Sequence, residues 1–166
     1  VPCGETVEDA RRSAEYGKYA PVGERGVANT AGSGFWFEDY ACHGMQEYFE
    51  ISNRETMLLP QCETLGCLEH IDEVLAVPGI DGIFVGPFDL STAMGIPGEF
   101  GRPEFREALE RIQRACAAAK KPSIIYAAAT QAAREDFDMG YDSVAFGMDA
   151  TTLTNAYRGV VKEIMG

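Results

Sequence analysis

Two acidic residues each follow a short apolar run that is typical of a buried strand. Glu63 comes directly after residues 56–62 (TMLLPQC), and Asp89 follows residues 82–86 (GIFVG) after a Gly-Pro turn. The two acids are 26 positions apart (89 − 63), close to the roughly 30 residues of one β/α/β unit, so both are expected at the same end of adjacent strands. Two carboxylates that converge there favour a hard divalent cation such as Mg²⁺ or Mn²⁺.

Each acid taken alone also has a structural interpretation. Glu63 can cap the helix that follows it or pair with a neighbouring basic residue, and Asp89 can be the N-cap of a short helix over residues 90–94. It is the pair, placed at equivalent points of successive units, that favours a metal site.

Repeated β/α units are expected to position these acids. Apolar runs predict parallel strands at residues 56–62, 82–86, 123–126 and 143–146, each too apolar to be half exposed. Helical spacing predicts helices at residues 65–74, 103–120, 130–139 and 149–165 and, after a threonine cap, over residues 6–16. Short strands at residues 1–2 and 25–27 bring the total to at most six, and a loop followed by a helix is expected over residues 17–49. The chain is therefore expected to be one α/β domain, residues 1–166.

Charge and composition limit the partners. The net charge of −12 argues against nucleic acid, because affinity for phosphates comes mostly from Lys and Arg. The chain has no apolar run long enough for a membrane span and no signal-like start, so a cytoplasmic location without membrane association is expected. Five cysteines lack metal-binding spacing, which favours reduced thiols, with Cys62 and Cys67 in a structural role.

Four stretches resemble the HpcH/HpaI aldolase family, the class II 2-keto-acid aldolases. They are QCET (61–64), VPGIDGIFVGPFDLSTAMGIPG (77–98), FGMDATTL (146–153) and ARRSAEYGKYAPVGERGV (10–27). The resemblance implies a (β/α)8 TIM barrel of the phosphoenolpyruvate/pyruvate-domain type. Because such a barrel needs about 250 residues, the chain is expected to be an N-terminally incomplete barrel, the C-terminal part of one catalytic domain. The resemblance also implies a homo-oligomer, a hexamer in which neighbours exchange the last helix.

The same resemblance assigns roles residue by residue. It makes Glu63 and Asp89 the ligands of a divalent cation (Mg²⁺, Mn²⁺ or Co²⁺), Gln61 a substrate contact, and the backbone at Phe88, beside Asp89, a contact for the substrate carboxylate. The implied activity is reversible cleavage of a 4-hydroxy-2-keto acid to pyruvate and an aldehyde through a metal-stabilised enolate. A citrate-lyase-type or decarboxylating enzyme, similar to macrophomate synthase, and a non-catalytic module of the same fold remain alternatives.

The chain also departs from the family pattern. The family's general-base histidine and its arginine are expected on segments that precede Val1, so no catalytic residue is assigned, and neither His43 nor His70 is given that role. Residues 28–46 differ from the family and are expected to shape specificity for the acceptor, with Ser33 as a further candidate for substrate contact. Phe88 is expected to narrow the pocket, and Arg25 to be a structural ion-pairing residue.

Overall fold

The computed structural model describes residues 1–2, 4–28 and 44–166, which form an α/β unit with a parallel sheet. The sheet order is β1-β2-β3-β4. Its strands are β1 (Gln61–Cys62), β2 (Ile83–Val85), β3 (Ser123–Ala127) and β4 (Ser143–Phe146). The helices of the described chain are α1 (Val7–Gly17), α2 (Met45–Glu55), α3 (Leu65–Glu69), α4 (Ile71–Ala76), α5 (Pro87–Ala93), α6 (Pro103–Ala119), α7 (Thr130–Met139) and α8 (Asp149–Met165). The predicted alternation of strands and helices is confirmed.

The strands predicted at residues 56–62 and 25–27 differ from the structure. In residues 56–62 only the last two pair as a strand, because Leu58 is engaged by a loop instead: its N–H donates to Asp81 Oδ2 (2.7 Å) and its carbonyl accepts from Asp81 N (3.0 Å). The predicted strand at residues 25–27 is wrong. The backbone there turns back onto α1, where Arg25 N donates to the carbonyl of Lys18 (2.9 Å).

The start of the chain runs alongside β1 without forming a regular strand. The Val1 ammonium donates to the carbonyl of Leu59 (2.9 Å), and the Val1 carbonyl accepts from Gln61 N (2.7 Å). The N-terminal residues thus cover the outer edge of β1.

The helix ends follow local chemistry. Thr6 caps α1 in a capping box with Asp9, as the sequence predicts. The helix expected over residues 65–74 is divided into α3 and α4 at His70. The helix expected at residues 90–94 begins earlier, because Pro87 suits a first helical position. The interpretation of Asp89 as an N-cap is therefore wrong: Gly86 is the N-cap, and Asp89 lies inside the first turn of α5.

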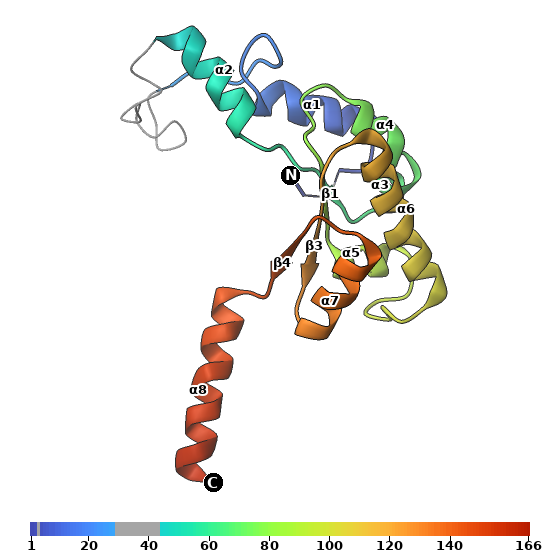
Figure 1. Cartoon of the computed structure of the whole chain (residues 1–166), viewed down its shortest axis with the longest axis vertical. Helices are drawn as coiled ribbons and strands as arrows, with labels where there is room; N and C mark the ends of the chain where they lie inside the picture. Colours follow the sequence, from blue (N-terminus) through green and yellow to red (C-terminus); the bar gives the residue numbers. More distant parts are fainter. Residues whose placement is uncertain (3, 29–43) are drawn as a thin grey trace.

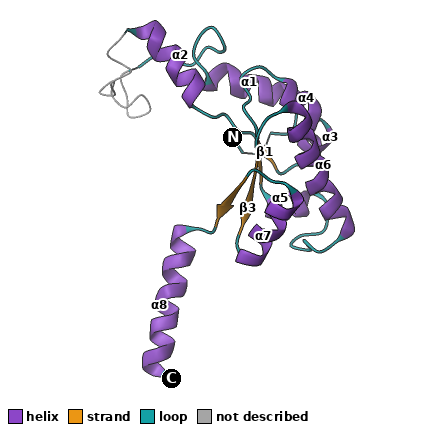
Figure 2. Ribbon diagram, in the orientation of Figure 1, coloured by secondary structure: helices purple, strands orange, loops and turns teal. Residues whose placement is uncertain are grey.

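The core lies between the sheet and a layer of helices. Figure 2 shows α3, α4, α5, α6 and α7 on the same side of the strands. Side chains that point to this layer, such as Ile83, Val85 and Ile125, are buried, whereas Phe84 and Tyr126 on the opposite face are half-buried. The alternation places one face of the sheet in the core, and the other face points away from the helix layer.

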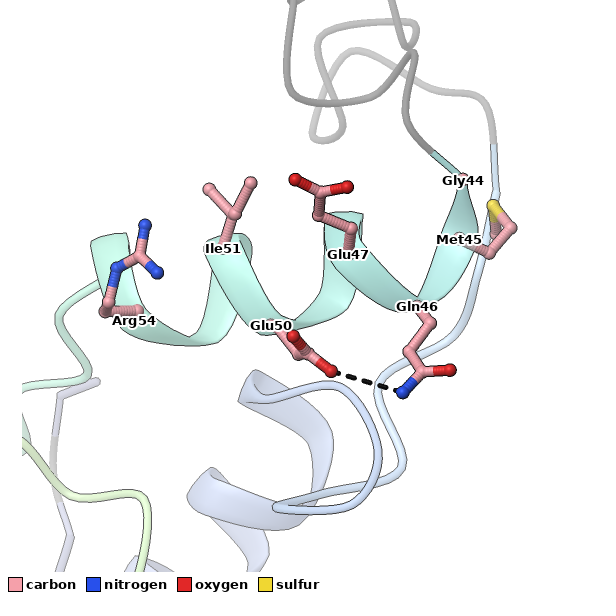
Figure 3. A pocket seen from close by; sticks show the side chains of 7 residues that line it. All are labelled: Gly44, Met45, Gln46, Glu47, Glu50, Ile51 and Arg54. Atoms are coloured by element: carbon pink, nitrogen blue, oxygen red, sulfur yellow. Dashed lines mark hydrogen bonds between the residues drawn. The ribbon is translucent and has the colours of Figure 1, made fainter.

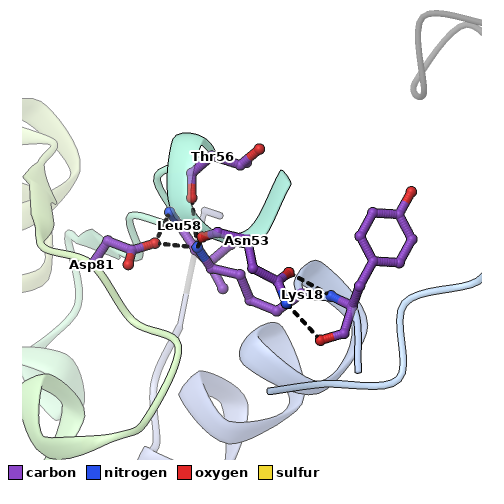
Figure 4. Close-up of polar contacts among 6 residues, drawn as sticks. Lys18, Asn53, Thr56, Leu58 and Asp81 are labelled. Atoms are coloured by element: carbon purple, nitrogen blue, oxygen red, sulfur yellow. Dashed lines mark hydrogen bonds and ion pairs between the residues drawn. The ribbon is translucent and has the colours of Figure 1, made fainter. Parts of the chain in front are cut away.

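A buried lysine joins α1, α2 and the loop before β2 (Figure 4). The Lys18 side chain is 2% exposed, and its ammonium lies 2.6 Å from Asp81 Oδ2. The same ammonium donates to the carbonyls of Asn53 (2.9 Å) and Thr56 (2.5 Å). Because an ammonium has three donors, these acceptors satisfy it fully, and the lysine fixes α2 against the sheet.

The last helix, α8, projects away from the rest of the chain (Figure 1). All its residues are exposed, including Leu153, Tyr157, Val160, Val161 and Ile164. These five recur at spacings of three and four and so fall on one helical face. None of the helices among residues 4–28 and 44–166 is long and apolar enough to cross a membrane.

Candidate metal and substrate site

Glu63 lies at the carboxyl end of β1 and is only 5% exposed. The Nε2 amide of Gln61, two residues earlier on the same face, donates to Glu63 Oε2 (3.1 Å). Glu63 does not cap the next helix, because that role belongs to Thr64, whose hydroxyl accepts from Cys67 N (3.1 Å). The carboxylate is therefore held at the strand end and oriented by an amide.

Gly86, at the end of β2, leaves room for the Glu63 carboxylate because it has no side chain. A Cβ at position 86 would lie 2.6 Å from Glu63 Oε2, so the carboxylate occupies the space that any other residue would fill. The strand register explains this approach: Cys62 pairs with Val85, which sets Glu63 beside Gly86. A glycine is required here by close contact and not by its backbone angles, since its φ is −98°.

Asp89 reaches the same space from the first turn of α5. Unlike Glu63 it is exposed. Both acids line a cavity of about 200 Å³, together with Gln61, Phe84, Gly86, Pro87, Phe88 and Tyr126. The structure thus brings together all four residues singled out from the sequence, Gln61, Glu63, Phe88 and Asp89, around one cavity at the carboxyl ends of β1 and β2.

The donor set of this cavity fits a hard divalent cation. It offers one buried and one exposed carboxylate, and Mg²⁺ and Mn²⁺ prefer oxygen ligands of this kind while keeping several positions for water or substrate. The chain's described part contains no cluster of three or more His, Cys, Asp and Glu suited to a metal. Glu63 and Asp89 are accordingly the protein carboxylates that this cavity can supply.

Two residues of the cavity were missed by sequence reasoning. Phe84 and Tyr126 lie on the same face because Phe84 pairs with Ile124, and Val85 with Ile125, in the β2–β3 ladder. This register sets Gly86 next to Tyr126, and Tyr126 and Glu63 line the same cavity. Alternation within each strand pointed to the face, but the pairing between strands was needed to place Tyr126.

Other sequence candidates lie elsewhere. His70 sits between α3 and α4, where its Nδ1 is 3.1 Å from Glu73 Oε1, and it does not line the cavity. The Arg25 guanidinium lies 4.8 Å from the centre of the Tyr19 ring. Ser33 and His43 lie outside the described residues, as does most of the divergent segment 28–46.

A larger cavity of about 620 Å³ lies along α2. Its lining consists of residues 44–54 of that one helix and its N-cap, and Figure 3 shows Gln46 donating to Glu50 on the helix surface. No strand end contributes to it. We therefore place the candidate site at Glu63 and Asp89, where two elements converge.

Cys62 and Cys116 are not suited to nucleophilic chemistry. Cys62, Cys67 and Cys116 are buried and free, which agrees with the prediction of reduced, structural thiols at 62 and 67. A hydrogen bond with Cys67 and burial raise the pKa of Cys62 well above its usual range. Burial raises the pKa of Cys116 to about 12, so both remain protonated at neutral pH.

Comparison with known proteins assigns the chain to one family. The profile of the HpcH/HpaI aldolase/citrate lyase family matches residues 1–156. A hydroxypyruvate/pyruvate aldolase of Cupriavidus necator is 35% identical over 159 residues, 95% of this chain and 57% of that protein. A 2-keto-3-deoxy-L-rhamnonate aldolase of Escherichia coli is 35% identical over 157 residues, 94% of this chain and 57% of that protein. The chain thus spans a little over half the length of these curated relatives.

Solved structures give the same picture of the fold. An HpcH/HpaI aldolase from Desulfitobacterium hafniense superposes with a TM-score of 0.84 at 28% identity. The match covers 99% of this chain and 62% of the aldolase chain. Macrophomate synthase superposes with a TM-score of 0.80 at 24% identity, and the match covers 99% of this chain and 57% of the synthase chain. At that identity the second likeness concerns the fold alone.

Proposed function

Because the chain belongs to the HpcH/HpaI aldolase/citrate lyase family, we propose that it is the C-terminal part of a divalent-metal-dependent carbon–carbon lyase. The reaction is the reversible cleavage of a 4-hydroxy-2-keto acid to pyruvate and an aldehyde. The observation that supports it most is the meeting of Glu63 and Asp89 in one cavity at adjacent strand ends.

In this proposal Glu63 and Asp89 hold the cation, which is Mg²⁺, Mn²⁺ or Co²⁺. When bound, the cation would act as a Lewis acid towards the keto-acid substrate. Burial keeps Glu63 in one place, and the Gln61 amide at 3.1 Å orients its carboxylate. The exposed Asp89 side chain closes the site from the side of α5.

The remaining residues of the cavity contact the substrate. Gln61 has a second amide hydrogen that can donate to a substrate oxygen, and a carbonyl oxygen that can accept from a substrate hydroxyl. The first turn of α5 leaves the N–H groups of Phe88 and Asp89 without helical acceptors, because Leu90 N is the first to bond within the helix, to the carbonyl of Gly86 (2.9 Å). These N–H groups suit the keto-acid carboxylate. The Phe88 and Tyr126 rings form apolar walls that narrow the cavity.

We extend the proposal to the whole assembly. The four-stranded parallel sheet supports a (β/α)8 barrel of which residues 1–166 form the C-terminal part of a single catalytic domain. The exposed apolar face of α8 supports a homo-oligomer, a hexamer by resemblance. A cytoplasmic location accords with a small keto-acid substrate and free thiols.

The experiment measures pyruvate release from a 4-hydroxy-2-keto acid by the complete protein, which includes the segments expected before Val1, with Mg²⁺ or Mn²⁺ and after removal of metal with EDTA. The variants are Glu63→Gln and Asp89→Asn, with Glu69→Gln on the surface of α3 as the matched control. We expect both site variants to lose metal binding and activity together, and the control to retain both. Metal binding that survives both substitutions would refute the assignment.

Assays with other substrates distinguish the aldolase from the decarboxylating alternative. The aldolase forms product from pyruvate only when an aldehyde is added, whereas a decarboxylase consumes oxaloacetate without one. Consumption of oxaloacetate alone, with no aldehyde-dependent product, would assign the same site to decarboxylation. In a protein that includes the segments expected before Val1, activity absent with every acceptor while the metal still binds would favour a non-catalytic module.

A further inference from the structure

A second cavity lies on the other side of β3, among the helices. Its volume is about 240 Å³, and its lining comes from α5, α6, α7, the loop before α6 and the end of β3. The sheet edges β1 and β4 contribute nothing to it. Most of the lining is aromatic or small and apolar, including Phe88, Phe100, Phe105, Tyr126 and Ala132.

The aromatic residues form a connected cluster. Phe88 meets Phe100 edge-on with ring centres 4.9 Å apart, and Phe100 is 5.4 Å from Phe105. Phe105 is buried, whereas Phe88 and Phe100 are partly open to the cavity mouth. The cluster gives the cavity a firm wall and an apolar entrance.

Three charged residues interrupt this apolar lining: Arg106 and Glu135, which are exposed and pair with each other, and Asp136, which is buried. Asp136 on α7 is 7% exposed and lines the cavity. Within residues 4–28 and 44–166 the carboxylate has neither a hydrogen bond nor an ion pair of its own, and the neighbouring Arg106 is engaged by Glu135 (3.4 Å). Burial, with a smaller contribution from the Glu135 charge, raises the pKa of Asp136 to about 6.

An unpartnered buried carboxylate is costly to the fold. An apolar residue would remove this cost, and asparagine would remove the part that is due to the charge, so a buried acid at position 136 suggests a binding partner. A ligand that brings its own donor to the carboxylate would supply it, and a positive charge would be paired with the acid out of water, where charge-assisted hydrogen bonds are strong.

We propose that this cavity binds a small organic amine with an apolar, preferably aromatic, body. The ammonium pairs with Asp136, and the body packs against Phe100, Phe105 and the alanines that follow β3. Aromatic walls suit such a ligand for a second reason, because ring faces attract cations. The site is distinct from Glu63 and Asp89 and does not depend on the proposed lyase activity.

The two cavities nevertheless share a wall. Pro87, Phe88 and Tyr126 line both of them. A bound amine would therefore contact Phe88, a residue that also lines the candidate metal site.

Three probes of the same shape test the proposal: 2-phenylethylamine, 2-phenylethanol and 3-phenylpropionate. Binding to the purified protein is followed by calorimetry and by NMR at pH 7.5, where Asp136 is ionised. We expect saturable binding of the amine, roughly tenfold weaker binding of the neutral alcohol, and weaker binding still of the acid. Equal affinity for amine and alcohol, or no saturable binding of the amine, would overturn the proposal.

Variants locate the binding. Asp136→Asn is expected to lower the affinity for the amine about tenfold and leave that for the alcohol unchanged, and Ala132→Phe, which fills the cavity, is expected to abolish both. Asp138→Asn changes an exposed acid on the same helix and is the matched control. Circular dichroism verifies that each variant folds. Amine binding that is insensitive to Asp136→Asn and Ala132→Phe in folded variants would refute the assignment.

Discussion

Replacing Gly86 with alanine isolates the contact that positions Glu63. The new Cβ would lie 2.6 Å from Glu63 Oε2, whereas ordinary contacts begin near 3.4 Å, so the oxygen must move by about 0.8 Å (3.4 − 2.6). Metal–oxygen distances tolerate only about 0.2 Å. We therefore expect the affinity for Mn²⁺ to fall about 10- to 100-fold, which is about 1.4–2.7 kcal/mol.

The same change has little effect on folding. The obstructing atom is the end of a flexible side chain, and the backbone angles of Gly86 (φ −98°, ψ 90°) are open to alanine. The reduced entropy of the unfolded chain offsets part of the strain, so the free energy of unfolding should change by less than about 1 kcal/mol.

Calorimetric titration with Mn²⁺ and thermal unfolding measure the two quantities on the same samples. Gly101→Ala is the control, because a Cβ at position 101 meets nothing within 4 Å. An unchanged Mn²⁺ affinity in folded Gly86→Ala would show that the Glu63 carboxylate is not a ligand. A large loss of stability would show that Gly86 serves the fold, and the reasoning would also fail.

Three further predictions concern stability and assembly. Lys18→Met should lower the free energy of unfolding in urea by about 3 kcal/mol, because it removes the partner of Asp81 and of two carbonyls. A change below about 1 kcal/mol would mean that this buried ion pair contributes little to stability. Between about pH 4 and pH 6 the unfolded chain ionises Asp136 before the folded chain does, so stability falls as pH rises. Asp136→Asn should remove this loss and stabilise the protein by up to about 3 kcal/mol at pH 7.5, with no gain below pH 4; a gain that does not depend on pH would contradict the cause. Leu153→Lys with Tyr157→Lys should lower the oligomer mass in light scattering without changing the far-ultraviolet spectrum, and an unchanged mass would exclude α8 from the interface.

The elements whose ends depend on local residues were predictable from the sequence. The limits of α7, α8 and β4 coincide with the predicted ones. Gly140 ends α7 because it adopts a left-handed conformation (φ 100°) that other residues avoid. The strand before Glu63 was predicted too long, because its early backbone bonds to the Asp81 loop, a contact between distant residues that no local pattern reveals.

Some features of the candidate site were likewise predictable from the sequence, and others were not. The positions of Glu63 and Asp89 at strand ends follow from the period of β/α units, and the cavity that contains both agrees with that reasoning. The difference between them, one buried and one exposed, depends on Gly86 and on where α5 begins. Tyr126 depends on register, and the lone acid at Asp136 depends on helix packing, which sequence patterns do not resolve.

The junction before α8 gives that helix a long reach. Gly147, with φ 68°, separates β4 from the helix, and its missing side chain leaves the turn open. A helix of 17 residues is about 25 Å long, so a rotation of about 10° at this hinge point would carry its far end some 4 Å, by the same rise of about 1.5 Å per residue. Small differences in the torsion angles of Gly147 and Met148 therefore displace the far end of α8 much more than its start.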